Sequence, residues 1–320
     1  MTTPTASLST VRPWQAFSCR VKALRRLSPS FLRVTFAAEE LRHFADNGYD
    51  QRFKLIFPAP ACGFAKLPTG DRWYSELRAL PDEEQCRVRT YTVREVRGEL
   101  GEVDVDMVVH EPHEGRPAPA LDWALHAEVG SELVLLGPDA RYDGEHGGVD
   151  FHPPVVEHRP ESGGRYPLDT NAELLIGGDE TAAPAIAAIL ERLPITAHGK
   201  VFIEVPEAAD VLEVDAPPDV EVHWLPREGA GWGEKLVPAV TEAAAGLRIR
   251  ATLDDIEDVD VDTEILWDAP ARPQACDSYV WIAAEAGVVK ALRRTIRQDL
   301  GLPKECGAFM GYWRLGKDAD

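Results

Sequence analysis

Hydrophobic and polar residues alternate in short segments through the first 140 residues. The alternation is clearest in 30–36, 52–58 and 102–110, and 131–138 closes the series. Because side chains of a strand point alternately to opposite faces, each segment predicts a strand with one apolar face. The residues expected on that face are Leu32, Val34, Phe36, Phe53, Leu55, Phe57, Val103, Val105, Met107 and Val109. Strands that follow one another in this way predict an antiparallel barrel or sandwich.

The pattern changes near Asn171. An apolar strand at 173–178 precedes a segment, 181–193, whose apolar residues recur at helical spacing. Further strands are predicted at 201–205, 220–225 and 278–284, and a helix is predicted at 288–301 with Gly301 as its C-cap. Strands that alternate with helices indicate a mostly parallel sheet covered on both faces.

Three segments rich in Pro, Gly or charge interrupt these elements. We expect 1–141 to form a β domain, 142–170 to be an insertion or linker, and 171–320 to form an α/β domain. Residues 59–86 read as a second insertion. Residues 254–268 contain eight acidic side chains and no basic one, which predicts a solvated loop.

A chain of 320 residues is long enough for two domains and a large bound cofactor. Its formal net charge of −20 argues against nucleic-acid and membrane-surface partners. The first residues contain no apolar core of signal-peptide length, and no apolar stretch approaches the roughly 20 residues of a membrane span. We therefore expect a cytoplasmic protein.

Cysteines and histidines, the residue types that often ligate metals, are dispersed along the sequence. Five cysteines, an odd number and without a CxxC pair, predict reduced thiols rather than disulfides or an iron–sulfur cluster. His146, His152 and His158 are evenly spaced in the Pro-rich insertion, but no regular structure fixes them there. We expect solvent-exposed histidines and no metal site.

Three motifs bear on chemistry. In 87–94 an arginine, a tyrosine and threonines alternate on a strand, which suits a flavin and its phosphates, although an ordinary surface strand has the same pattern. The segment 119–130 predicts a short helix that presents amides to a phosphate, caps the barrel with Trp123, or does both. In 176–186 a Gly–Gly turn precedes a helix capped by Asp179 or Thr181. Nucleotides bind at such strand ends. The motif GxGxxG is missing, however, so the segment could equally be a capped helix that binds no nucleotide.

Together the motifs carry a resemblance. They are FKLIFP at 53–58, RTYT at 89–92, VDVDMVVH ending at His110, PALDWA at 119–124, GGDETAAPAI at 177–186 and GYWRLG at 311–316. With these the chain resembles the siderophore-interacting proteins, a branch of the ferredoxin-reductase-like flavoproteins. The resemblance implies an antiparallel six-stranded Greek-key barrel that binds FAD, followed by a Rossmann-like, mostly parallel sheet domain that binds NADH or NADPH.

The resemblance also implies residue roles. FAD would contact Arg89, Thr90, Tyr91, Thr92, Asp106, Val108, His110, Ala120, Leu121 and Trp123, with Trp313 near the flavin. The nicotinamide nucleotide would face Gly178, Asp179, Glu180 and Thr181. An anionic ferric siderophore would be attracted by Lys54, Arg314 and Arg141. Family members commonly carry GPAS where this chain has Ala118, Pro119, Ala120 and Leu121, so a serine contact to phosphate is lost.

The implied activity is FAD-dependent reduction of siderophore-bound Fe(III) to Fe(II) with electrons from NAD(P)H. Iron arrives already coordinated by the siderophore, so the protein needs no metal ligands of its own. Two alternatives remain at this point. The protein could be a flavin reductase that exchanges electrons with ferredoxin or flavodoxin, or a protein that binds ferric siderophores without catalysis.

Overall fold

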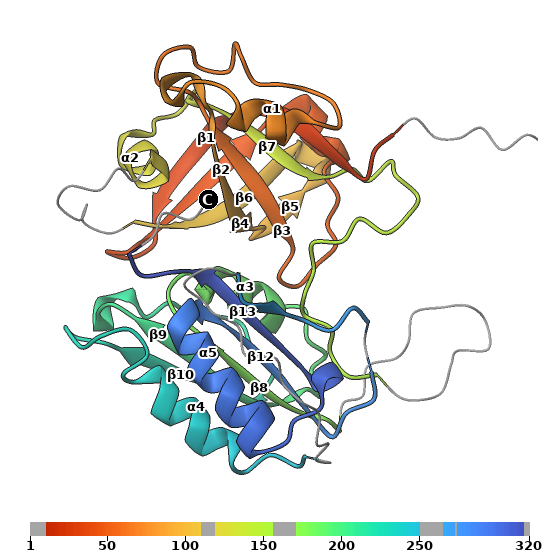
Figure 1. Ribbon diagram of the computed structural model, residues 1–320, viewed down its shortest axis with the longest axis vertical. Coiled ribbons are helices and arrows are strands. Elements are labelled where there is room, and N and C mark those ends of the chain that lie inside the picture. Colours follow the sequence, from red (N-terminus) through yellow and green to blue (C-terminus); the bar gives the residue numbers. More distant parts are fainter. Residues whose placement is uncertain (1–10, 110–118, 156–170, 250–264, 273, 317–320) are drawn as a thin grey trace, which may run out of the picture.

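The computed structural model describes residues 11–109, 119–155, 171–249, 265–272 and 274–316. Two domains are visible, an N-terminal barrel at the top of Figure 1 and an α/β domain below it. The chain passes from one to the other after residue 138, where the last barrel strand ends. The fold is therefore the predicted combination of an antiparallel barrel and a mostly parallel sheet.

The barrel is one curled antiparallel sheet with the strand order β4-β3-β7-β1-β2-β6-β5. Every residue predicted for the core face is buried except Leu32, which is half-buried. The strands are β1 Trp14–Arg26, β2 Phe31–Ala37, β3 Arg52–Phe57, β4 Arg87–Thr92, β5 Glu95–Arg97, β6 Glu102–Val108 and β7 Glu132–Pro138.

The sheet has seven strands, so the expected number of six is wrong by one. The extra strand, β5, is short and continues from β4 around a bend at Val93 and Arg94. The Arg94 amide donates to the Asp104 carbonyl at 2.9 Å, and β5 then pairs with β6. One bent segment thus pairs with β3 at one end and β6 at the other, which closes the barrel.

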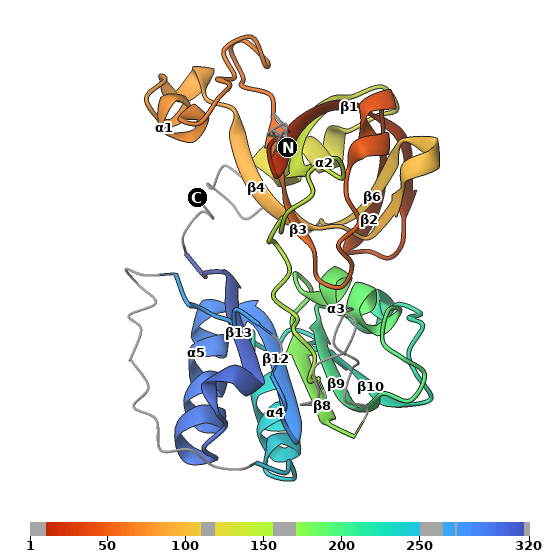
Figure 2. The same cartoon turned by 90° about the vertical axis from the view of Figure 1, so that its right-hand side faces the viewer.

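The insertion 59–86 packs against the outside of the barrel. It carries helix α1 (Trp73–Arg78) and stands beside the barrel strands in Figure 2. Buried Leu77 and Cys86 of the insertion share a small hydrophobic cluster with Ile56 of β3 and Val134 of β7. The outward apolar positions of two barrel strands are covered in this way.

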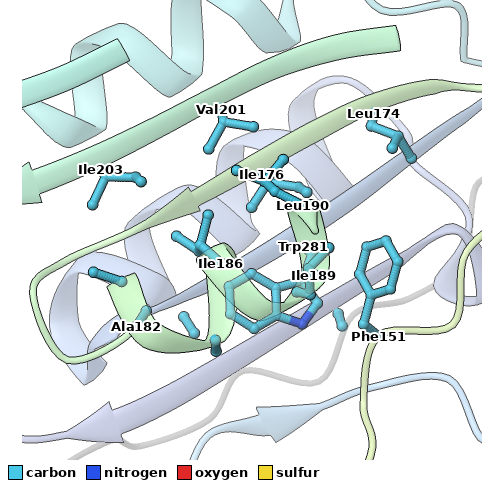
Figure 3. Close-up of a cluster of buried hydrophobic side chains, with 14 of the residues drawn as sticks. Phe151, Leu174, Ile176, Ala182, Ile186, Ile189, Leu190, Val201, Ile203 and Trp281 are labelled. Carbon is cyan, nitrogen blue, oxygen red and sulfur yellow. The ribbon is translucent and has the colours of Figure 1, made fainter. Parts of the chain in front are cut away.

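The second sheet has the order β10-β9-β8-β12-β13-β11, and only β11 runs antiparallel to its neighbour. The packing of α3 on one face of this sheet is drawn in Figure 3, where its apolar side chains meet those of β8 and β9. Helices α4 and α5 cover the other face. The strands are β8 Glu173–Gly178, β9 His198–Val205, β10 Asp219–Pro226, β11 Trp267–Asp268, β12 Ser278–Glu285 and β13 Gly307–Trp313, and the helices are α3 Ala183–Leu190, α4 Leu236–Ala244 and α5 Ala286–Arg294.

Sequence periodicity located most of this domain. The helix predicted at 288–301 appears as α5 followed by a π-helical turn at 295–299, and Gly301 adopts a left-handed φ of 76°, as a C-cap requires. The acidic segment lies largely outside the described residues. Its described end forms the short strand β11 at Trp267 and Asp268, and Asp268 pairs with Arg293 at 2.7 Å, whereas Ile265 and Trp267 are exposed.

The expectation of five reduced cysteines is wrong. Cys276 and Cys306 form a disulfide with their Cα atoms 5.8 Å apart, while Cys19, Cys62 and Cys86 are free thiols. The two partners are 30 residues apart in sequence, but they precede β12 and β13, which are parallel neighbours. Parallel pairing brings the two strand beginnings together, and no short spacing in the sequence reveals that proximity.

The two domains meet through buried and charged contacts. Asp210, buried at the end of a 3₁₀ turn after β9, accepts hydrogen bonds from the Ser30 amide at 2.7 Å and the Ser30 hydroxyl at 2.9 Å. Phe31 of the barrel lies in the core cluster of the α/β domain, which also includes Phe151 of the connecting segment. Part of the predicted linker is thus built into the domain junction.

Candidate functional site

The strand β4 lies at the edge of the barrel sheet and keeps the predicted alternation. Arg89 and Tyr91 face Leu55 and Phe53 of β3 and so share the side of the barrel core. Tyr91 packs against that core, and its burial raises the pKa of the phenol, with Arg89 nearby acting in the opposite direction. Thr90 points to the other face.

Helix α2 (Pro119–His126) closes the same side of the barrel. Leu121 is buried in the core, and Ala120 and Trp123 pack against it. The Trp123 ring lies 5.6 Å from Phe57 and 6.2 Å from Phe36 between ring centroids. The segment caps the barrel as predicted, with Trp123 half-buried against the core rather than within it, and its contact with a phosphate stays a prediction.

Arg89, Tyr91 and the start of α2 therefore border one corner of the barrel. A guanidinium, an aromatic ring with a phenol and a helix N-terminus are the groups that pair with pyrophosphate and pack against a flavin ring. The residues present fit FAD in this corner.

The opposite face of β6 carries an ion-pair network. Both carboxylate oxygens of Asp106 accept hydrogen bonds from Arg33, at 2.6 and 2.7 Å, and Arg94 lies 3.6 Å away. Val108 packs against the core cluster of the α/β domain. The observed contacts of Asp106 and Val108 therefore stabilise the fold, and the contact of each with FAD stays a prediction. His110 lies outside the described residues.

Lys54 is half-buried on the outer face of β3. Its ammonium donates to the Thr90 hydroxyl at 2.6 Å. Burial lowers its pKa, and the adjacent Arg52 lowers it further. Arg52 pairs with Asp150 at 2.6 Å and lies over the Trp267 ring at 4.5 Å. Sequence reasoning missed Arg52, although its spacing of two from Lys54 puts both cations on one face of a strand.

The two other predicted basic residues have different surroundings. Arg141 is turned toward Asp139, whose carboxylate accepts its guanidinium at 2.9 and 2.6 Å. The contacts of Arg141 are with Asp139, and those of Lys54 are with Thr90. Arg314 is half-buried and directly follows Trp313 at the end of β13.

Asp179 connects the two motifs GGDET and GYWR. This buried carboxylate follows β8, and one of its oxygens accepts the Thr181 amide at 2.9 Å and the Thr181 hydroxyl at 2.5 Å. The other accepts the Glu285 amide at 2.8 Å and the Trp313 indole at 2.7 Å. Burial and the neighbouring Glu180 raise the pKa of Asp179 to about 7.

Glu180 forms the second connection at these strand ends. Its carboxylate accepts two hydrogen bonds from the buried Arg227, at 2.6 and 2.8 Å, and one from the Trp232 indole at 3.3 Å. The Trp232 ring in turn meets the Trp313 ring edge-on, with 5.2 Å between centroids. The predicted nucleotide residues are therefore joined to Trp313 by one continuous group of contacts.

A cavity of about 340 Å³ opens beside this group. It is lined by residues 206–207, 227–230 and 232, which follow β9 and β10 at the carboxyl edge of the parallel strands. Sequence reasoning missed it. The Gly-rich stretch 229–233 after a strand was the available signal.

The predicted exposure of the histidines is wrong for two of them. His146 and His152 are partly buried. The His146 ring contacts the Asp139 carbonyl at 2.8 Å, and burial lowers the pKa of His152. His158 lies outside the described residues, and within those ranges no group of three His, Cys, Asp or Glu side chains could hold a metal ion.

Comparison with known proteins decides the family. The family profile for the siderophore-interacting FAD-binding domain matches residues 20–142, and the profile for siderophore-interacting proteins matches 171–316. The ferric vibriobactin reductase ViuB of Vibrio cholerae is 30% identical over 298 residues, which cover 92% of this chain and 88% of the relative. The chain belongs to the siderophore-interacting protein family.

Solved structures agree with this assignment. A siderophore utilization protein from T. fusca superposes with a TM-score of 0.69 at 25% identity and covers 97% of both chains. The ferredoxin reductase of carbazole 1,9a-dioxygenase shares the fold, with a TM-score of 0.52 at 18% identity over 92% of this chain and 67% of its own. The predicted resemblance is confirmed.

The family assigns the cofactor to the barrel. Residues 20–142 form an FAD-binding domain, and this member of the siderophore-interacting family is an FAD-dependent oxidoreductase with the ferredoxin-reductase fold. The individual contacts predicted for FAD and for the nucleotide stay predictions. No helix among the residues in the described ranges is long and apolar enough to cross a membrane.

Proposed function

We propose that this protein reduces siderophore-bound Fe(III) to Fe(II) with electrons from a nicotinamide dinucleotide. The observation that carries the proposal is the position of Trp313. It ends β13, which runs toward the barrel in Figure 2, and its indole is fixed by Asp179 at the strand end where a nucleotide is expected. Trp313 is therefore joined to the predicted nucleotide residues, and it would lie between them and a flavin bound in the barrel.

Bound FAD supplies a group that accepts a hydride from reduced nicotinamide and can release its two electrons one at a time. One dinucleotide would therefore reduce two ferric ions and release one proton. The protein's own residues bind and orient the reactants. Arg89 and the start of α2 would hold the phosphates of the cofactor, while Asp179 holds the Trp313 ring in place.

Lys54 would attract the anionic ferric chelate. On a chain with a net charge of −20, an anion needs a local positive potential to approach. Lys54 supplies one on the outer face of β3, whereas the neighbouring Arg52 is paired with Asp150. Partial burial strengthens the interaction of Lys54 with an anion because the local dielectric constant is lower. Thr90 would orient the ammonium.

The test is the variant Lys54→Ala. We expect KM for an anionic ferric siderophore to rise about 10-fold, as loss of one attraction of roughly 1.4 kcal/mol requires, with the FAD content unchanged. Lys54→Arg should keep most of the affinity. Lys200→Ala removes the same charge from an exposed position on β9 and should leave KM unchanged. An unaltered KM in Lys54→Ala would exclude Lys54 from docking.

The electron donor is tested separately. Anaerobic mixing with NADH, with NADPH and with reduced ferredoxin, followed by flavin bleaching, separates a nicotinamide-dependent enzyme from one that uses a protein carrier. A protein that purifies without flavin would support siderophore binding without catalysis. We further propose a cytoplasmic location, where reduced nicotinamide nucleotides are available.

A further inference from the structure

The cavity beside Arg227 is built by two loops that follow neighbouring parallel strands. The Arg227 amide donates to the Val205 carbonyl at 2.8 Å, and the Glu228 amide donates to the Pro206 carbonyl at 3.0 Å. Glu228 has a left-handed φ of 53°, which is uncommon for a residue other than glycine. Its carboxylate accepts the Ala208 amide at 2.8 Å, which fixes the acid at the rim of the cavity.

The lining carries more negative than positive charge. Arg227 is the one cation among the described lining residues, and both of its terminal nitrogens donate to Glu180. A second buried carboxylate, that of Glu204, lies 3.5 Å from the same guanidinium. Glu207 and Glu228 add two exposed carboxylates at the rim. The charge of Arg227 is therefore already balanced within the protein, and an incoming anion would meet a net negative lining.

The helix that starts beside the cavity also offers little to a phosphate. Glu204 accepts the Gly233 amide at 2.8 Å, the Lys235 amide at 3.1 Å and the Leu236 amide at 3.0 Å at the beginning of α4. These are the groups that would otherwise bind an anion at a helix N-terminus. The Lys235 ammonium donates to the Pro226 carbonyl.

The cavity lies where one half of a bound dinucleotide is expected. Ligands of open α/β sheets bind beyond the carboxyl ends of the strands. Trp232 separates the cavity from Trp313, and the two rings are in contact. A dinucleotide whose nicotinamide lies at Trp313 would have its other half on the far side of Trp232, in the cavity.

We propose that this cavity binds the adenosine half of NADH and that Glu207 and Glu228 select against NADPH. The inference rests on the proposed function and specifies its electron donor. A ribose 2′-hydroxyl can donate a hydrogen bond to a rim carboxylate, as in many NAD-dependent proteins. The 2′-phosphate of NADPH would place a dianion against the same carboxylates, with the arginine already engaged by Glu180.

The test measures binding of the adenosine half alone. Calorimetric titration of the FAD-loaded protein with 5′-AMP and with 2′,5′-ADP should give an affinity about 10-fold or more lower for 2′,5′-ADP, because like charges at contact distance repel. In the double variant Glu207→Gln/Glu228→Gln this ratio should fall to about 3-fold or less, through tighter binding of 2′,5′-ADP. Glu221→Gln removes a matched exposed charge near the start of β10 and should preserve the ratio.

Three results would overturn the inference: equal or tighter binding of 2′,5′-ADP to the unmodified protein, no binding of 5′-AMP, or an unchanged ratio in the double variant. Flavin bleaching in the same preparation distinguishes failure of the NADH selectivity from failure of the proposed reductase function. Equal bleaching rates with NADH and NADPH would reject the selectivity and leave the reductase standing. Bleaching by reduced ferredoxin alone would reject the nicotinamide donor itself.

Discussion

The hydrogen bond between Trp313 and Asp179 gives the sharpest prediction about the site. Trp313→Phe removes the indole donor, which lies 2.7 Å from the carboxylate, and keeps an aromatic ring beside Trp232. A hydrogen bond to a charged group contributes about 1.5–3 kcal/mol. With some loss of packing from the smaller ring, we expect the free energy of unfolding to fall by about 2–4 kcal/mol.

The loss should depend on pH in a defined direction. The pKa of Asp179 is raised to about 7 in the folded protein, from an ordinary value near 4. Stability from this group is therefore present at low pH and is lost as pH rises from about 4 to about 7. The Trp313 donor lowers that pKa, so removing it raises the pKa further and extends the loss above pH 7. The variant should differ more from the unmodified protein at pH 8.5 than at pH 5.5, by about 1.4 kcal/mol per unit of added pKa shift.

Urea unfolding at pH 5.5, 7.0 and 8.5, followed by circular dichroism, measures this difference. The matched control is Trp232→Phe, which alters the same ring pair but removes a longer, 3.3 Å hydrogen bond to Glu180 and no donor to Asp179. The control should lose stability by a similar amount at each pH. A loss in Trp313→Phe that is the same at all three pH values would refute the assignment of Asp179 as the titrating group.

Two further predictions concern the stability of the fold, at the domain junction and at the disulfide. Asp210→Ala should lower the free energy of unfolding by about 3–5 kcal/mol, because it removes the acceptor of the Ser30 amide and hydroxyl at the domain junction. Urea midpoints should show that loss, and exposed Asp215→Ala should show almost none. Cys306→Ser should cost about 3–4 kcal/mol by opening the 30-residue loop closed with Cys276. Dithiothreitol should reproduce the loss in the unmodified protein and leave the variant unaffected.

The spacing of apolar residues predicted the two domains because it reflects which face of each strand or helix is buried. The two-residue alternation at 52–58 and the helical spacing at 181–193 reflect which face of each element is buried, and burial dominates folding energetics. The number of barrel strands was missed by one for a related reason. A three-residue strand such as β5 shows no periodicity of its own, and it pairs with β6 because the chain bends after β4.

The sites were less accessible to sequence reasoning where they depend on contacts between distant residues. Arg89, Asp179 and Trp313 are candidates because each lies in a motif that the family shares, and their contacts with the cofactors stay predictions. Arg227 lies in no such motif, and its role is defined by Glu180, 47 residues earlier in the chain. The disulfide between Cys276 and Cys306 was missed for the same reason, since only the parallel pairing of β12 and β13 makes those residues neighbours.

Whether a cation of this protein can attract an anionic ligand depends on the groups that already pair with it. On a chain with a net charge of −20, an anionic ligand needs a locally basic pocket. Arg33, Arg141 and Arg227 are instead held by carboxylates of the protein itself, each through two hydrogen bonds. Lys54 differs, because its ammonium donates to the hydroxyl of Thr90 on a half-buried face, and no carboxylate in the described part of the chain forms an ion pair with it. Among these cations, Lys54 is therefore the one whose removal should weaken attraction of the ferric chelate without breaking an ion pair of the fold.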